Sequence, residues 1–570
     1  MRFSIFLCIL STWCVAQTQL TPFEKGNGNQ SPTYEEMRDF YQKLDKNHST
    51  ILQKEYGLTD SGYPLEVLFF SKDRNFNPTK STKKAILLVN NGIHPGEPDG
   101  IDASMMLLRD LAEGRIEAPK NVLLAFVASY NIGGMLNRGS YSRANQNGPE
   151  EYGFRGNARN FDLNRDFIKA DTRNARSFQE IFHELNPDVF IDNHVSNGAD
   201  YQYTLTYIAT NKERLGRLLG SYYHQEMNRS ISNDLRSKGI DPIPYVNVWN
   251  GTPEQGYEQF MDTPRYATGY TTLFNTIGTV PETHMLKPYA DRVKVTYENM
   301  LSYINYTDKH YKTIKEKRLE NLKQYKPGST YTLGWEIDRS KVESIEFKGY
   351  EASKIKSEVS GLPRLFYDRT KPFTKNIKFY NTYKSTKDIQ IPRYYIVPKS
   401  QWPVIEHLER NRIEMTPLDK DSTFVVELYE ISDYQTAKNP YEGHYNHYNT
   451  QTKASTKQIR FKKGDFLIST NQPGVKYLFE TLEPSAVDSF FNWNFFDSIL
   501  MRKEHFSDYV FEDTAAQLLK ENKALQTAFE LEKKINPEMR KSAAMQLNWI
   551  YEHSPYFEAA YRQYPIARIL

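Results

Sequence analysis

A histidine and a glutamate, both of which can bind metal ions, stand three residues apart at His94 and Glu97. The preceding residues 85–90 are almost all apolar, which is typical of a buried strand. Glycine and proline then break the chain, and apolar residues recur with helical spacing over 101–111. The sequence therefore predicts a turn between a strand and a helix that presents both side chains. A zinc site requires such an arrangement.

Three further segments of the same region carry polar residues that could do chemistry, namely 157–166 (NARNFDLNRD), 191–196 (IDNHVS) and 278–285 (GTVPETHM). His194 directly follows an apolar stretch, so it is the natural third metal ligand. Two histidines and one glutamate form a ligand set for Zn²⁺ that leaves a fourth position for water. Zinc lowers the pKa of such a water toward about 7 and polarises a carbonyl oxygen.

The other segments supply groups that could act beside the metal. Glu282 follows an apolar stretch, so it can lie at a strand end. There its carboxylate could take the proton of the water and pass it to a leaving nitrogen. Asn164 and Arg165 place a neutral donor beside a guanidinium, which suits a carboxylate because arginine binds it through two parallel hydrogen bonds. Asp162 could orient a ligand histidine through its second ring nitrogen.

Apolar and amphipathic segments alternate through the first half of the chain. Predicted strands cover residues 64–71, 85–90, 121–129 and 187–191, and predicted helices cover 34–44, 98–111 and 173–185. This alternation indicates an α/β domain with a mixed, largely parallel central sheet flanked by helices. Ligands of such sheets bind beyond the carboxyl ends of the strands, where we expect His94 and His194.

With 570 residues, the chain is long enough for several domains. We expect an N-terminal lead and helix over 17–50, the α/β domain over 51–315, and a charged linker around 309–328. Short alternating runs rich in Tyr, Phe, Val and Ile predict a smaller β-rich accessory region over 330–475. A helical C-terminal region is expected over 480–570, and it includes the aromatic run 489–500.

Residues 1–16 have the features of a secretory signal peptide, with Arg2 before an apolar stretch and the small Ala16 at its end. Both cysteines, Cys8 and Cys14, fall inside it, so the mature chain would have no cysteine nucleophile, Cys–zinc site or disulfide. A lipoprotein signal at Cys14 is the alternative. We therefore expect a secreted or periplasmic protein. A net charge of +3 gives no sign of nucleic-acid binding, and no later apolar stretch is long enough to predict a transmembrane span.

The four motifs HPGE, DLNR, DNH and PETH, in this order, resemble those of the zinc carboxypeptidase family, which includes carboxypeptidase A. The resemblance covers roughly residues 33–309 and points to the exported microbial members. It implies a carboxypeptidase-like fold and one Zn²⁺ per chain. It also implies hydrolysis of C-terminal bonds in peptides that have a free terminal carboxylate.

The resemblance also implies a role for each matching residue. His94, Glu97 and His194 would bind zinc, Asp162 would support His94, and Glu282 would be the general base. Asn164 and Arg165 would hold the substrate carboxylate, Arg155 or its rival Arg143 would stabilise the oxyanion, and a mobile tyrosine would be Tyr270, Tyr266 or Tyr257.

Two alternatives stay open at this point. A zinc deacylase or amidase could use the same scaffold, although it would have less use for Asn164 and Arg165. A catalytically inert protein could instead bind peptide or glycan through its tyrosine-rich second half. The remaining histidines are expected to be structural, or in His444 and His447 to belong to a polar aromatic loop, and residues 490–496 are expected to form core.

Overall fold

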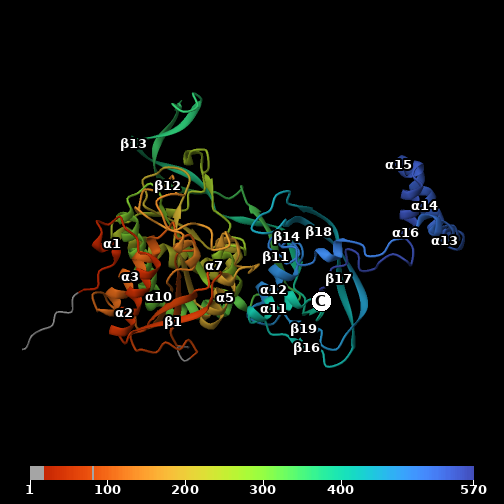
Figure 1. The fold of residues 1–570 in the computed structure, drawn as a ribbon, viewed down its shortest axis with the longest axis horizontal. Helices are drawn as coiled ribbons and strands as arrows, with labels where there is room; N and C mark the ends of the chain where they lie inside the picture. The colour runs from red at the N-terminus through yellow and green to blue at the C-terminus, as the bar shows by residue number, and fades with distance from the viewer. Residues whose placement is uncertain (1–17, 80–82) are drawn as a thin grey trace, which may run out of the picture. The chain divides into compact units, whose positions relative to one another are not determined.

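A computed structural model describes residues 18–79 and 83–570 (Figure 1). The predicted signal peptide and both cysteines lie outside these residues. The chain folds as two compact units. The first unit runs to Gln324 and adds Trp335–Lys384, and the second comprises Tyr325–Gly334 and Ser385–Leu570.

A mixed sheet forms the centre of the first unit, in the order β1-β2-β4-β3-β5-β10-β7-β8, with β6 also paired to β10. Its strands are β1 (Ile51–Leu58), β2 (Pro64–Phe70), β3 (Ala85–Asn90), β4 (Val122–Val127), β5 (Val189–Asp192), β6 (His194–Ser196), β7 (Leu205–Ala209), β8 (Pro242–Pro244) and β10 (Ile277–His284). The central strands β4, β3, β5 and β10 run parallel, whereas β1, β2 and β7 pair antiparallel with their neighbours. The predicted fold class is confirmed.

Helices pack against this sheet, with α10 against β3, β4 and β10, and α5 against β1 and β2. The helical segments of the first unit are α1 (Pro22–Lys25), α2 (Tyr34–Asn47), α3 (Asp99–Ala112), α4 (Ile132–Leu136), η1 (Leu163–Arg165), α5 (Arg173–Leu185), α6 (Lys212–Leu215), α7 (Arg217–Tyr222), η2 (Tyr223–Met227), α8 (Asn228–Ser237), η3 (Pro253–Gln255), α9 (Ala267–Thr271), η4 (Thr272–Phe274) and α10 (Tyr289–Leu322). Side chains of Thr33 and Thr172 cap the amino ends of α2 and α5, which explains where these helices begin.

The predicted linker around 309–328 is largely wrong, because α10 continues to Leu322. Its last turns are bound to the rest of the unit by polar side chains. The Arg318 guanidinium lies 2.5 Å from the Asp188 carboxylate, and the Asn321 side chain donates a hydrogen bond to the Leu215 carbonyl. These buried contacts hold a charged sequence in helical form.

The β-rich stretch after residue 330 does not form one region, because its first part belongs to the first unit. There β12 (Glu343–Lys356) and β13 (Pro363–Tyr380) form a long antiparallel ribbon (Figure 1). The end of β13 also pairs with β9 (Tyr257–Glu258). Phe347 and Phe379 lie buried in one cluster with Tyr203 of the first unit. This apolar packing attaches the base of the ribbon to the α/β unit, while most of its outer part is exposed.

The second unit is built on a sheet of six strands in the order β16-β19-β15-β20-β17-β18. They are β15 (Tyr394–Val397), β16 (Thr416–Pro417), β17 (Ser422–Thr436), β18 (His447–Phe461), β19 (Phe466–Ser469) and β20 (Ala567–Ile569). The strands β11 (Thr330–Ile337) and β14 (Tyr383–Gln390) pair with each other. Helices of this unit are α11 (Trp402–Arg410), α12 (Val475–Leu482), α13 (Asp508–Glu521), α14 (Lys523–Ile535), α15 (Pro537–Lys541) and α16 (Ala543–Glu552).

The aromatic run 489–500 is mostly turns rather than the predicted helix, and only η5 (Asp497–Leu500) is helical. Asn494 has a φ of 67°, a left-handed conformation that interrupts any helix there. Phe490, Phe491 and Trp493 are buried, as the expected core role requires. No helix among the described residues is both long and apolar enough to span a membrane.

Candidate metal centre and substrate pocket

The loop between β3 and α3 carries the first two predicted ligands, and close packing fixes its shape. Gly92 has a φ of 65°, which favours glycine. A Cβ atom on Gly96 would lie 2.4 Å from the Arg143 Nε and 2.9 Å from the Gly153 carbonyl oxygen. Only glycine at this position lets the arginine approach the neighbouring Glu97.

His194 is brought to the same place by strand pairing. It begins β6, which runs parallel to β10 with His194 opposite Glu282. His94, Glu97 and His194 are all buried, and their potential ligand atoms lie within 4.8 Å of one another. The His94 Nδ1 lies 3.2 Å from one Glu97 oxygen and the His194 Nδ1 lies 2.9 Å from the other. The structure thus brings the three predicted ligands together.

Each ligand histidine is oriented by a carboxylate at its other ring nitrogen. The His94 Nε2 is 3.0 Å from Asp162, as predicted, and the His194 Nε2 is 2.9 Å from Asp192. These bonds leave the Nδ1 of both rings facing the centre of the trio. Sequence reasoning missed Asp192, although its place two residues before His194 and at the end of β5 could have indicated it.

The donor atoms of His94, Glu97 and His194 are of the kind and number that bind a zinc ion. The His94 Nδ1 is buried and makes no hydrogen bond that meets the usual geometry. Two histidine nitrogens and a carboxylate converge on one point, and aspartates support both rings. This is the donor set of catalytic zinc sites with an open fourth position. Across residues 18–79 and 83–570, no other group of His, Cys, Asp and Glu converges in this way.

Two arginines lie beside the ligand carboxylate. The Arg143 Nη2 is 2.6 Å from Glu97, whereas Arg155 is 3.8 Å from Glu97 and 2.9 Å from Asp162. Burial alone would raise the pKa of Glu97, but Arg143 and the two ligand histidines outweigh it and hold that pKa well below the ordinary value. Of the two arginines, Arg155 lines the pocket that contains the metal ligands.

Glu282 lines the same pocket, within β10 rather than at its end. Its carboxyl group has lost most of its hydration, which raises its pKa to about 8, while His194 acts in the opposite direction. A carboxyl group with a raised pKa beside a metal site can both accept and return a proton near neutral pH.

Asn164 and Arg165 lie in a short helical turn that Asp162 caps by accepting a hydrogen bond from the Asn164 amide. The Arg165 guanidinium lies over the Tyr266 ring, 4.5 Å from its centroid. The Asn164 side chain accepts a hydrogen bond from the Ala267 amide at 3.3 Å. Both predicted carboxylate-binding residues line the pocket. Their contacts with Tyr266 and Ala267, at the start of α9, hold them there.

The predicted tyrosine, Tyr270, does not line the pocket. It is fully buried in an aromatic core, where its hydroxyl lies 3.0 Å from His183. Tyr257 is also buried elsewhere, with its hydroxyl bound to a carbonyl. The rival Tyr266 does line the pocket, and so does Tyr245, which sequence reasoning missed because no spacing marks it in its long loop.

The pocket has a volume of about 220 Å³. Its metal side holds the three ligands, Glu282 and Arg155, and Asn164 and Arg165 also contribute to its lining. Its remaining walls come from Val195, Asn197, Ile208, Tyr245, Asn247, Trp249, Phe260, Asp262, Tyr266, Ala267, Thr268 and Val280. The pocket thus combines the predicted metal ligands, base and carboxylate-binding pair in one cavity.

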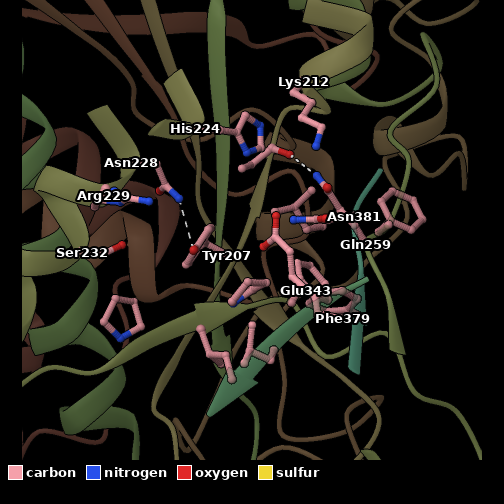
Figure 2. Close-up of a pocket in the computed structure, with 18 of the residues that line it drawn as sticks. Tyr207, Lys212, His224, Asn228, Arg229, Ser232, Gln259, Glu343, Phe379 and Asn381 are labelled. Carbon is pink, nitrogen blue, oxygen red and sulfur yellow. Dashed lines mark hydrogen bonds between the residues drawn. The ribbon is translucent and has the colours of Figure 1, made fainter. Parts of the chain in front are cut away.

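A larger cavity of about 790 Å³ adjoins this pocket, and Ile208, Tyr245 and Phe260 line both. Figure 2 shows its polar lining, with Asn228 bound to the Tyr207 hydroxyl at 3.2 Å. His224 in this cavity lies 2.9 Å from the Thr210 carbonyl and has no metal-binding partner among the described residues. No metal site is formed in this cavity by the residues that line it.

Comparison with known proteins gives relatives over most of the chain, although no family model matches. Carboxypeptidase 2 of Trichophyton rubrum is 22% identical over 490 residues, which cover 81% of this chain and 84% of the relative. Carboxypeptidase 2 of Trichophyton equinum is 21% identical over 492 residues, with 81% and 84% covered.

Solved structures match about half of the chain. The metallocarboxypeptidase from Burkholderia cenocepacia covers 49% of this chain and 70% of its own, with 14% identity and a TM-score of 0.36. Carboxypeptidase A from Helicoverpa armigera covers 50% and 75%, with 13% identity and a TM-score of 0.35.

The sequence match to curated carboxypeptidases and the site geometry lead to one conclusion. The sequence carries four motifs in the expected order, and the fold assembles their ligand residues into one buried trio. Curated relatives align with 81% of its length. The chain is therefore similar to curated carboxypeptidases over most of its length, and its buried trio has the donor set of a zinc metallopeptidase.

Proposed function

We propose that the protein is an exported metallocarboxypeptidase that holds one Zn²⁺ and removes residues from peptides with a free C-terminal carboxylate. The observation that carries this proposal is that three groups of side chains, each suited to a different task, line one cavity. The metal ligands, the carboxyl group of Glu282, and the Asn164–Arg165 pair all line the same pocket.

Zinc held by His94, Glu97 and His194 would supply a water of lowered pKa and a Lewis acid for the scissile carbonyl. Glu282 takes a proton from the attacking water and returns it to the leaving amine. Lost hydration raises the pKa of Glu282 to about 8, so its protonated form is accessible when the leaving amine needs a proton. A bound cation would lower this pKa.

The pair Asn164 and Arg165 binds the terminal carboxylate of the substrate and so selects the last peptide bond. Arg165 offers the planar fork of donors that matches a carboxylate, and its stacking on Tyr266 limits its movement. Arg155, whose guanidinium is half exposed at the edge of the pocket, supplies positive charge for the oxygen of the scissile carbonyl.

Export rests on the signal-like sequence of residues 1–16 and on the lack of cysteine after it. A measured N-terminus of the protein recovered from its native host tests this part separately. We expect it to begin shortly after Ala16, and recovery of the intact sequence within the cell would contradict export.

A zinc amidase on the same scaffold is the competing function, and one comparison separates the two. The zinc-loaded protein is given a peptide and the same peptide with a C-terminal amide. We expect kcat/KM for the amide to be at least about 100-fold lower, since the charge-assisted bonds to Arg165 are lost. Equal rates on both peptides would contradict the carboxypeptidase proposal.

A further inference from the structure

The larger cavity of about 790 Å³ takes no part in the reaction described so far (Figure 2). Much of its lining comes from η2 and α8, from the short strand β8, and from the base of the ribbon of β12 and β13, all of which belong to the first unit. The η2 segment is a π-helix and contributes His224 and Gln225 to the lining. Such segments are rare and are frequent at functional sites.

The charged side chains of this cavity balance one another. Among the described residues that line it, three are basic and three are acidic, namely Lys212, Arg229, Arg236, Asp241, Glu343 and Glu346. The Arg236 and Asp241 side chains are paired at 3.2 Å. Burial lowers the pKa of His224, so this ring is uncharged at pH 7. A ligand without net charge therefore suits the cavity better than an anion or a cation.

Uncharged hydrogen-bonding groups make up much of the remaining lining. They include the side chains of Ser221, Gln225, Asn228, Ser232, Gln259 and Asn381. The Asn381 Oδ1 is buried and has no partner of the usual geometry within the part of the chain that the structure describes. Amides and hydroxyls offer donors and acceptors side by side, which is what the hydroxyl groups of a sugar require.

Aromatic rings provide the second kind of surface that a sugar uses. They belong to Tyr203, Tyr207, Tyr245, Phe260 and Phe379. The C–H groups on one face of a sugar ring form an apolar surface that can pack on an aromatic ring, while the hydroxyls at its rim bond to polar side chains. Tyr207 lies where both kinds of group meet, since its hydroxyl accepts a hydrogen bond from Asn228.

An extended peptide fits the cavity less well, although β8 is the last strand of the central sheet on this side. Peptides add to the edge of a sheet through backbone N–H and C=O groups. Pro242 and Pro244 have no N–H, so β8 offers at most the amide of Ile243. The edge strand thus favours a ligand that is bound through side chains.

We propose that the larger cavity binds an uncharged glycan, and that the substrates of the adjoining pocket are glycopeptides. The second part rests on the proposed carboxypeptidase function. Ile208, Tyr245 and Phe260 line both cavities, so a glycan in the larger one lies beside the C-terminal residues of a peptide in the pocket.

The first test measures sugar binding by the full-length protein on an array of uncharged oligosaccharides and their sialylated forms. We expect uncharged oligosaccharides to bind and the sialylated forms to bind at least about 10-fold more weakly. Calorimetry with the oligosaccharide that binds best should give a Kd of about 1 mM or lower. No binding of any uncharged oligosaccharide, or a preference for the sialylated forms, would overturn the inference.

Substitutions locate the bound sugar. In the double variant Gln225→Ala/Asn381→Ala we expect binding to weaken at least about 10-fold, because two amides of the lining are lost. Asn233→Ala is the control, since this exposed amide of α8 does not line the cavity, and it should keep the wild-type affinity. Equal affinity in the double variant and the wild type would place the sugar elsewhere. If the double substitution instead weakens the binding of an unglycosylated peptide, the cavity binds peptide.

A turnover measurement tests the substrate class with the zinc-loaded protein. The oligosaccharide found on the array is attached to the last or to the second-last residue of a peptide. We expect kcat/KM for one of these glycopeptides to exceed that of the plain peptide at least about 10-fold, and the double variant to lose this preference. Equal rates on all three would overturn the substrate class and leave the carboxypeptidase proposal standing. Sugar binding without cleavage of any peptide would refute the proposed reaction and leave the glycan site standing.

Discussion

The acidic residues on the two sides of the pocket differ in whether they have hydrogen-bonding partners. On the metal side, Glu97, Asp162 and Asp192 each bind a histidine, and arginines lie beside the first two. On the far side, Asp262 has no hydrogen-bond partner of the usual geometry, although its burial is as deep. Both sides remove carboxylates from water, but only the metal side compensates their charge, with Glu282 as the exception there.

The difference is visible in the direction of the pKa shifts. Although burial acts to raise it, the pKa of Asp162 is held below its ordinary value by His94 and by Arg155. Lost hydration dominates at Asp262 and Glu282, and their pKa values rise to about 6 and about 8. Compensated carboxylates are suited to hold other groups in place, whereas uncompensated ones are suited to react or to bind a cation.

The largest expected effect belongs to Glu282. In Glu282→Gln, kcat should fall at least about 1,000-fold because the amide that replaces the carboxylate cannot accept the proton of the attacking water. Zinc content, measured by atomic absorption, should stay near one per chain because the substitution leaves all three ligands in place. Full activity in this variant would remove Glu282 from the reaction, and lost zinc would show that Glu282 supports the metal ligands instead.

Arg165→Met should lower kcat/KM for free-carboxylate peptides by about 100-fold or more, mostly through KM. The loss reflects two charge-assisted hydrogen bonds to the substrate carboxylate. Arg159→Met is the control, since this exposed arginine neighbours the same segment but does not line the pocket. If both variants lose the same activity, the effect is structural and Arg165 does not bind the carboxylate.

Asp262 should make the fold less stable as the pH rises. Its pKa is near 3.9 in an unfolded chain and about 6 in the folded one, so the folded state binds the proton more tightly. The free energy of unfolding should therefore fall between about pH 4 and pH 6, by up to about 3 kcal/mol, and stay lower above that range.

Urea unfolding at pH 4 and pH 7.5 measures this effect. Asp262→Asn should lose most of the Asp262 contribution to the pH dependence, whereas Glu343→Gln should keep it. If Asp262→Asn and the wild type lose the same stability between the two pH values, Asp262 is compensated after all.

The smallest effect is expected for the supporting carboxylate of His194. Asp192→Asn should weaken zinc binding about 10- to 100-fold, because the ring nitrogen loses a charged partner that orients it. Competition with a zinc chelator measures the affinity. An unchanged affinity would mean that strand pairing alone orients His194, and the two sides of the pocket would then differ less than their hydrogen bonds indicate.

The sequence was sufficient to predict the three metal ligands, but not Asp192 behind His194 and not Asp262 or Tyr245 on the far side. His94, Glu97 and His194 follow or begin strands whose apolar character can be recognised locally, and parallel pairing brings such ends together. Asp262 and Tyr245 lie in irregular segments on either side of η3 and β9, so nothing in the sequence indicates which of their side chains turn inward. Only three-dimensional packing decides that.

Two errors have the same origin in tertiary packing. Tyr270 is closer in sequence to Glu282 than its rivals, but it lies within α9, and the buried side of that helix takes it into the aromatic core. The ribbon of β12 and β13 has the alternation of an accessory sheet, and only the packing of Phe347 and Phe379 assigns it to the first unit. Local patterns predict such elements but not their neighbours.

The pairing of β6 with β10 has a consequence for how this enzyme could diversify. His194 and Glu282 stand opposite each other on adjacent strands, so backbone hydrogen bonds set their separation. Most of the residues that line the rest of the pocket come from the stretch between Tyr245 and Thr268, outside that ladder. Substitutions in this stretch would change which C-terminal residues the enzyme accepts, while the separation of His194 and Glu282 would stay the same.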